Sequence, residues 1–350
     1  MRRYFILLFI YSLQLAAEQP VIYPPALQKG DLIALVFPAS YLVDQGKKAQ
    51  EIINRKAKWL EQKGYRTILY PTKIHPEGYL AGSDTQRAAA LMNAWKNPKV
   101  KAIWCFRGGY GTPRILDLLD YDWIHNNPKI LIGMSDITAL HQAIRQKTGL
   151  VTFLGPVLNY FDEKEGDFDG AYAFSEVEQL LVEHRVGTIP MPVGFTPFKI
   201  LKQGKAQGRL VGGNLSLIAS LCGTRWEIDT DNKILVLEDV GEEIYRIDRL
   251  LWQLQDAGLF ENPAGIILSS WHDCKSTSQG SVSLQHLFEH YFDTAHYPVV
   301  MGFPSGHCKY QTTLPLNVLA EIDTKEQTVT LLTSAVSNPP KEKPSKKSAP

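Results

Sequence analysis

The segment Leu131-Ile132-Gly133-Met134-Ser135-Asp136-Ile137-Thr138 passes directly from one kind of secondary structure to another. It opens with an apolar run of strand type that breaks at a glycine, and a helical pattern then extends from Ile137 to Lys147. A serine on a sharp strand-to-helix turn is typical of a nucleophile elbow. Isoleucine at 137 departs from the usual Gly-x-Ser-x-Gly motif. Ser135 is therefore a candidate nucleophile, with a helix-capping serine as the alternative.

The same alternation of strand and helix recurs on the N-terminal side of this segment. Short apolar runs are followed by helical patterns, the pairs being 31–36 with 46–64, 67–70 with 83–97, 102–106 with a helix from Pro113, and 130–132 with 137–147. Such alternation predicts a parallel sheet with helices on both faces, whose ligand site lies at the carboxyl ends of the strands. Ser135 follows one of these ends.

The chain has room for two domains, since it holds 350 residues of which 44% are hydrophobic. We predict an α/β protein in which residues 28–165 form an N-terminal, Rossmann-like parallel-sheet domain. Residues 208–334 are predicted to form a smaller, mixed α+β C-terminal domain with strands at 233–237 and 265–269 and helices at 215–222 and 247–257. Between them, residues 166–207 carry Pro190, Pro192 and Pro197 without a clear period, which predicts a linker.

The two ends of the chain are predicted to lie outside the folded domains. Arg2-Arg3, an apolar stretch to Ala17 and the small pair Ala16-Ala17 predict a signal peptide over residues 1–17. We therefore expect export to a periplasm, without stable membrane insertion after cleavage, because the stretch is shorter than a spanning helix needs. Residues 335–350, rich in lysine and proline, are predicted to be a disordered tail.

Charge and cysteine content narrow the function classes. The 37 Lys+Arg residues nearly balance 36 Asp+Glu residues, which disfavours nucleic acid as a partner. An oxidising compartment allows the four cysteines to pair, but buried free thiols are an equal alternative.

A glycine turn, Arg107-Gly108-Gly109-Tyr110-Gly111, follows the strand predicted at 102–106. Thr112 and Pro113 are predicted to be the N-cap and first-turn proline of the next helix. Arg114 occupies the place of the third glycine in Gly-x-Gly-x-x-Gly, so we predict no dinucleotide and no other cofactor. The free amides of the turn are suited to holding an oxyanion; a tight turn without chemistry is the alternative.

Two further residues complete a candidate triad with Ser135. Glu238 stands at the end of the strand predicted at 233–237, and His307 lies in the loop Pro304-Ser305-Gly306-His307, the only one of nine histidines in a Gly-Pro-rich loop beside an apolar strand. A serine hydroxyl becomes a good nucleophile when a neutral imidazole takes its proton and a carboxylate orients that imidazole.

The motifs around these residues resemble, in order, those of the LD-carboxypeptidase family of serine peptidases. They are Arg107 to Gly111, Gly133 to Thr138, Gly212-Gly213-Asn214-Leu215-Ser216, Leu237-Glu238-Asp239 with Tyr245 to Arg249, and Gly306-His307. The resemblance spans residues 30–333 and implies a muramoyltetrapeptide carboxypeptidase that removes the terminal D-alanine of murein tetrapeptides. It also implies a two-domain subunit, commonly a homodimer, with its active site between the domains.

The resemblance assigns roles residue by residue. It implies Ser135 as nucleophile, His307 as general base and Glu238 as its orienting acid, with the backbone amides of Gly109 and Asp136 as the oxyanion hole. Arg107 and Asn214 are the predicted substrate-binding residues, Arg107 as a cation for the terminal carboxylate or, alternatively, as a structural ion pair.

The sequence departs from the family pattern at three positions. Met134 replaces an aromatic residue, Cys308 follows the base histidine, and Asn317 replaces a glycine. None of them belongs to the triad, so we expect them to affect substrate preference rather than chemistry.

Three alternatives to this function stay open. His286-Leu287-Phe288-Glu289-His290 fits a zinc motif, although an ordinary amphipathic helix explains it as well, and we predict no metal. An exported protein that binds muropeptide without cutting it is a second hypothesis. The third is the related branch of immunity peptidases that cleave peptide-nucleotide antibiotics, which export disfavours.

Overall fold

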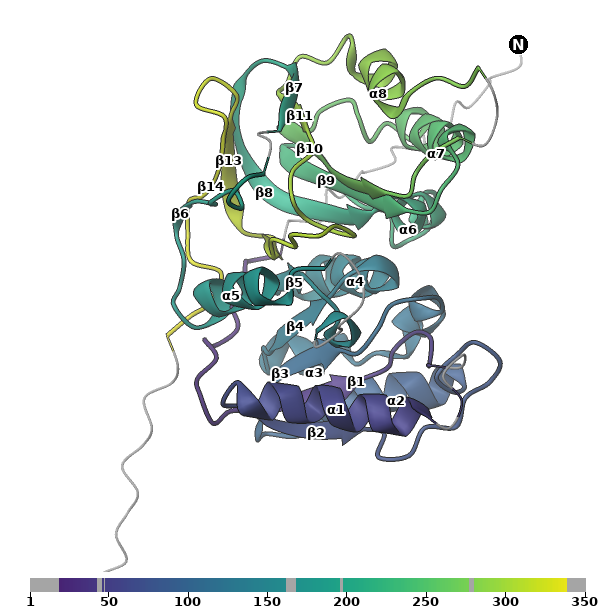
Figure 1. Cartoon of the computed structure of the whole chain (residues 1–350), viewed down its shortest axis with the longest axis vertical. Coiled ribbons are helices and arrows are strands. Elements are labelled where there is room, and N and C mark those ends of the chain that lie inside the picture. The colour runs from purple at the N-terminus through teal and green to yellow at the C-terminus, as the bar shows by residue number, and fades with distance from the viewer. Residues whose placement is uncertain are drawn as a thin grey trace, which may run out of the picture.

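A computed structural model describes residues 19–42, 46, 48–161, 168–195, 198–276 and 280–338 of the chain. The predicted signal peptide and residues 339–350 of the predicted tail lie outside the described residues. Figure 1 shows two stacked bodies, each built on its own sheet, with the N-terminal half in the lower one. Within the described residues, no helix has the combination of length and apolar character that crossing a membrane requires.

The lower body is built on a six-stranded sheet. In spatial order its strands are β12 (Leu314–Leu316), β5 (Thr152–Leu154), β4 (Ile130–Gly133), β3 (Val100–Cys105), β1 (Leu32–Val36) and β2 (Arg66–Tyr70). The five strands from the N-terminal half are parallel to their neighbours, and only β12 is antiparallel. The predicted parallel α/β arrangement is thereby confirmed.

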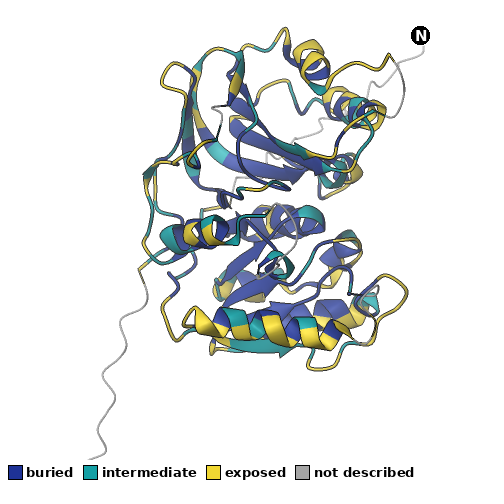
Figure 2. Cartoon of the chain, in the orientation of Figure 1, coloured by how far each residue is buried: buried dark blue, intermediate teal, exposed yellow. Residues whose placement is uncertain are grey.

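Helices cover both faces of this sheet, which explains the almost continuous apolar runs of its strands. Side chains of α1 (Ala49–Gln62) and α5 (Gly170–Leu181) pack on one face. Those of α2 (Asp84–Lys96), α3 (Tyr121–Asn126) and α4 (Thr138–Thr148) pack on the other. Figure 2 shows the result, with buried strands and an exposed outer side on α1.

Short 3-10 helices connect several of these elements. They are η2 (Thr112–Leu118), η3 (Ser135–Ile137) and η4 (Leu158–Tyr160). The helix predicted from Pro113 is thus a 3-10 helix. Gly111, with φ of 122°, is its N-cap, and Thr112 is its first residue rather than the predicted cap.

The upper body is built on an eight-stranded mixed sheet. Its strands in spatial order are β6 (Gly187–Thr188), β14 (Thr328–Leu331), β13 (Leu319–Asp323), β8 (Lys205–Asn214), β9 (Lys233–Val240), β10 (Gly265–His272), β11 (Val299–Met301) and β7 (Lys199–Lys202). The central four, β8 to β11, are parallel. Helices α6 (Leu215–Leu221), α7 (Ile244–Asp256) and α8 (Leu284–Phe292) pack on one face.

The opposite face of the eight-stranded sheet of the upper body packs into the hydrophobic core of the lower body. Leu210 of β8 and Val236 of β9 belong to the same apolar cluster as Phe153 of β5 and Phe161. The two bodies therefore share one continuous hydrophobic core, which fixes the carboxyl ends of their parallel strands relative to each other.

The segment 166–207 has more regular structure than its predicted role as a linker suggests. It contains α5, whose N-cap Asp169 accepts a hydrogen bond from the backbone of Tyr172, together with the edge strands β6 and β7. The apolar residues of α5 recur with helical spacing. The prolines later in the same segment favour a linker, and for that reason the sequence did not indicate this helix. Ala335 and Val336, at the start of the predicted tail, are also buried.

Candidate active site

Ser135 occupies a strained turn between β4 and η3. Its φ of 63° lies in the left-handed region, which non-glycine residues seldom adopt, while Met134 before it is extended. No side-chain cap is formed at the start of η3 or α4, and the Ser135 hydroxyl has no hydrogen-bond partner among the described residues. Ser135 is therefore not a helix cap, which was the alternative to a nucleophile in the sequence analysis.

The glycine turn lies directly against this serine. A Cβ on Gly108 would stand 2.8 Å from Cβ and 3.0 Å from Oγ of Ser135, and one on Gly109 would stand 2.4 Å from Oγ of Ser40. Glycine is needed at both positions because any side chain would collide with these neighbours. Neither the N–H of Gly109 nor that of Asp136 has an acceptor within the described residues.

Glu238 and His307 form a buried pair on the second body. The imidazole Nδ1 lies 2.6 Å from Oε2 of Glu238, and the backbone N–H of His307 donates to the same oxygen over 3.2 Å. Glu238 is fully buried and lies within β9, two residues before its end, not at the end as predicted. Gly306 allows this approach, since a Cβ there would stand 2.6 Å from the Glu238 side chain.

Two opposing effects set the basicity of His307. Burial alone lowers the pKa of the imidazole, but the charge of Glu238 and the hydrogen bond to it, helped by Asp239, raise the pKa above its usual value. The bond at Nδ1 leaves Nε2 as the nitrogen directed away from Glu238.

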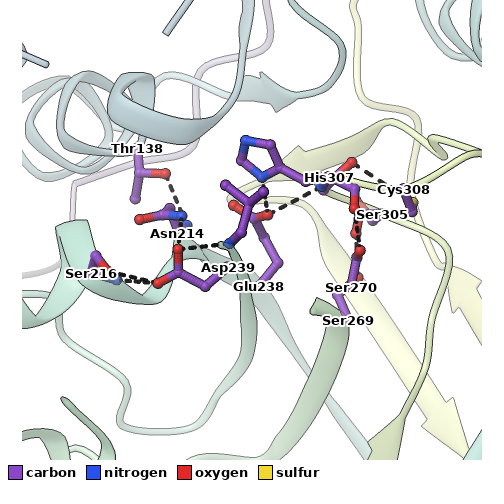
Figure 3. A network of polar contacts seen from close by, with 12 residues as sticks. Thr138, Asn214, Ser216, Glu238, Asp239, Ser269, Ser270, Ser305, His307 and Cys308 are labelled. Atoms are coloured by element: carbon purple, nitrogen blue, oxygen red, sulfur yellow. Dashed lines mark hydrogen bonds and ion pairs between the residues drawn. The ribbon is translucent and has the colours of Figure 1, made fainter. Parts of the chain in front are cut away.

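One hydrogen bond links the strand beside Glu238 to the helix that follows the Ser135 elbow. The hydroxyl of Thr138, three residues after Ser135, accepts a 3.0 Å hydrogen bond from the backbone of Asn214 at the end of β8. Asn214 is in turn the register partner of Glu238 on β9. Figure 3 shows Thr138 next to Asn214, with Glu238 and the His307 imidazole beside them. No hydrogen bond joins Ser135 to His307 in the described part of the chain.

Asn214 and Asp239 form a second network beside the pair. The Asn214 amide donates to Asp239 over 2.8 Å and accepts from the backbone of Leu217, so its side chain caps α6. Asp239 also accepts from the backbone and hydroxyl of Ser216. Burial raises the pKa of Asp239 despite these hydrogen bonds. Asp239 and Ser216 belong to the sequence motifs, but the sequence alone gave them no role. The predicted start of a helix directly after Asn214 is the feature that indicates a capping network there. The substrate contact of Asn214 stays a prediction.

Arg107 lies at the start of the glycine turn and is partly exposed. Its Nη1 donates a 3.0 Å hydrogen bond to the carbonyl of Tyr41. Burial raises the pKa of Tyr160, the negative charge of Glu238 raises it further, and the positive charge of Arg107 lowers it. The substrate contact of Arg107 stays a prediction.

The three departures from the family pattern have distinct surroundings. Met134 is buried in the shared core. Asn317 has φ of 74°, a conformation that asparagine tolerates better than most residues, and its amide donates to the carbonyl of Gly149 over 2.8 Å. The thiol of Cys308 donates to the carbonyl of Tyr310, and burial raises its pKa to about 12.

The sequence also singled out a histidine motif on α8 and the four cysteines. His286, Glu289 and His290 are exposed on α8, where the ring of His290 packs edge-on against Tyr291. All four cysteines, Cys105, Cys222, Cys274 and Cys308, are free thiols.

The ordered motifs and the two-body fold correspond to one family over most of the chain. Residues 33–155 match the LD-carboxypeptidase N-terminal domain, and residues 207–322 match the LD-carboxypeptidase C-terminal domain. The chain belongs to the LD-carboxypeptidase family. The predicted resemblance is therefore confirmed, and with it a peptidase of this family.

Comparison with individual proteins shows how close the similarity is. The probable murein peptide carboxypeptidase of Bacillus subtilis is 38% identical over 314 residues, covering 88% of this chain and 93% of the relative. The murein tetrapeptide carboxypeptidase of Pseudomonas aeruginosa is 32% identical over 289 residues, covering 79% and 87%. The solved structure of the microcin C7 self-immunity protein MccF is similar with a TM-score of 0.82 at 26% identity, covering 90% of this chain and 99% of that structure.

Proposed function

We propose that this protein is an exported serine LD-carboxypeptidase that removes the terminal D-alanine from murein tetrapeptides through a Ser135-His307-Glu238 triad. The murein substrates named for its Bacillus and Pseudomonas relatives support the substrate class. The observation that carries the proposal is the buried contact between Glu238 of β9 and the loop residue His307. Glu238 is the register partner of Asn214, whose backbone donates to Thr138 beside the Ser135 elbow.

The residues divide the chemistry in a definite order. Nε2 of neutral His307 takes the proton of the Ser135 hydroxyl as Oγ attacks the peptide carbonyl, and Glu238 stabilises the imidazolium that forms. The unpaired N–H groups of Gly109 and Asp136 hold the developing oxyanion. His307 then protonates the departing amine of D-alanine. Water, activated by the same imidazole, hydrolyses the acyl-enzyme.

Two residues are proposed to contact the substrate. The guanidinium of Arg107 has N–H groups beyond the one bonded to Tyr41, and a carboxylate is its natural bidentate partner. This suits a carboxypeptidase, whose substrate ends in a carboxylate next to the cleaved bond. Asn214 has one further amide N–H that forms no hydrogen bond within the described residues, and we assign it a bond to the peptide.

Export and assembly are also part of the proposal. The charged, apolar and small-residue pattern of residues 1–17 supports secretion to the periplasm, and the family resemblance supports a homodimer. Cell fractionation and light scattering on the purified protein test these two points.

The structural similarity to MccF supports one competing function, cleavage of a peptide-nucleotide antibiotic. A muropeptide-binding protein without activity would not need a nucleophile, a base and an orienting acid together. Purified protein incubated with a murein tetrapeptide separates the candidates. Release of free D-alanine supports the proposal, binding without release supports the binding protein, and cleavage of microcin C7 alone supports the immunity peptidase.

A further inference from the structure

Arg87 and Asp136 hold the same peptide unit from opposite ends. Nη1 of Arg87 donates to the carbonyl of Gly111 over 2.9 Å, and Oδ2 of Asp136 accepts from the N–H of Thr112 over 2.8 Å. The hydroxyl of Thr112 also donates to the backbone carbonyl of Asp136. The last peptide of the glycine turn is thus attached both to α2, which carries Arg87, and to the residue after the candidate nucleophile.

All three of these side chains are buried. Arg87, Thr112 and Asp136 are at most 1% exposed. Arg87 is further anchored by hydrogen bonds to the carbonyls of Pro38 and Gly82 and by an ion pair with Asp84. Burying a charged group lowers stability unless the group is paired. If this contact served packing alone, apolar side chains would hold the turn at a smaller desolvation cost.

The clamp acts on the part of the turn that faces the elbow. Gly108 lies against Ser135, and the N–H of Gly109, next in the chain, has no acceptor within the described residues. The N–H of Asp136 has none there either. One side chain therefore connects the two loops that each supply an oxyanion donor, and its position sets the distance between these donors.

We propose that the carboxylate of Asp136, with Arg87, is a positioning group that holds the glycine turn in register with the Ser135 elbow. This inference rests on the proposed function for its catalytic consequence. Asp136 thereby acts twice, through its backbone N–H and through its side chain.

Asp136→Ala and Asp136→Asn test the side chain, because both variants retain the backbone N–H. The alanine variant frees the N–H of Thr112 and is expected to lower kcat for D-alanine release about 100-fold while KM changes less than about twofold, because a displaced oxyanion donor affects the transition state. Asparagine keeps an acceptor oxygen and is expected to restore kcat to within about tenfold of the wild type.

Asp120→Ala is the matched control for loss of stability. Asp120 accepts a hydrogen bond from the backbone of Trp123 and caps α3 in the same body, and within the described residues it forms no hydrogen bond to residues 107–112 or to the Ser135 elbow. This variant is expected to unfold at a lower temperature and to keep the wild-type kcat.

Hydrogen exchange provides a readout that does not depend on turnover. The amides of residues 108–112 are expected to exchange faster in Asp136→Ala and at the wild-type rate in Asp120→Ala. Unchanged exchange in the turn, or equal kcat losses in the two alanine variants, would overturn the positioning role. If the wild type releases no D-alanine, the proposed function fails, and the exchange measurement still decides whether Asp136 holds the turn.

Discussion

His307 and Glu238, which are 69 residues apart in the chain, meet through a 2.6 Å contact between Nδ1 and Oε2. The contact is buried, and the other carboxylate oxygen, Oε1, has no hydrogen-bond partner among the described residues. The pair is thus a single oriented unit, in which the carboxylate orients the imidazole through Nδ1 and leaves Nε2 as the nitrogen to which we assign the proposed proton transfer.

Glu238→Gln removes the charge of this unit at nearly constant shape. We expect kcat/KM for D-alanine release to fall by about 10³-fold, because the amide no longer stabilises the imidazolium that forms during attack. Steady-state kinetics measures the loss, and circular dichroism checks that the fold is retained. Activity within tenfold of the wild type would show that Glu238 does not orient the base.

The pH profile reports on the same pair. His307 must be neutral to accept the serine proton, and its pKa is raised by Glu238 against the effect of burial. We therefore expect kcat/KM to fall on the acidic side below a pKa above 6.5. In Glu238→Gln the raising effects of the carboxylate are lost while burial remains, so this limb moves to lower pH. A limb at the same pH in both proteins would contradict the assignment.

Gly108→Ala tests the close approach of the glycine turn to the nucleophile. The added methyl would stand 2.8 Å from Cβ of Ser135, so the turn or the elbow must shift. We expect at least a tenfold loss of kcat and about 1–3 kcal/mol of lost stability from overpacking. Gly170→Ala is the control, because a Cβ there meets its nearest atom at 3.5 Å, and it is expected to behave like the wild type.

The sequence predicts most of the lower body, and it names Glu238 and His307, which the structure brings into contact. The strand and helix runs were visible because parallel strands buried on both faces are apolar throughout, and Ser83, which caps α2 in a capping box, is a recognisable helix start. Glu238 and His307 were found by residue type, by their turns and by the family motifs.

Other features depend on contacts that no local pattern encodes. Strand β12 is three residues long with Pro315 at its centre, and it pairs with β5 from far along the chain. Thr112 looked like a helix cap because its neighbours fit that pattern, yet its hydroxyl bonds to Asp136. Long-range partners of this kind compete with local propensity and decide the outcome.

The burial of His141, on α4 shortly after the Ser135 elbow, predicts that the free energy of unfolding depends on pH. Its Nε2 lies 2.9 Å from the carbonyl of Gly133, and burial lowers its pKa to about 4. The unfolded chain takes up this proton near pH 6.5 and the folded protein does not, so stability falls between pH 6.5 and 4 by roughly 3 kcal/mol. Urea unfolding of His141→Gln should show a smaller loss over this range. An identical pH dependence in both proteins would rule out this contribution.

Release of D-alanine from a murein tetrapeptide by Ser135→Ala tests the central claim most directly. The hydroxyl has no hydrogen-bond partner among the described residues, so its removal should leave the unfolding temperature of the protein unchanged. The account predicts that the wild type releases D-alanine and that the folded variant releases it at least about 10³-fold more slowly. Release by the folded variant at near the wild-type rate would contradict the assignment of Ser135 as the nucleophile.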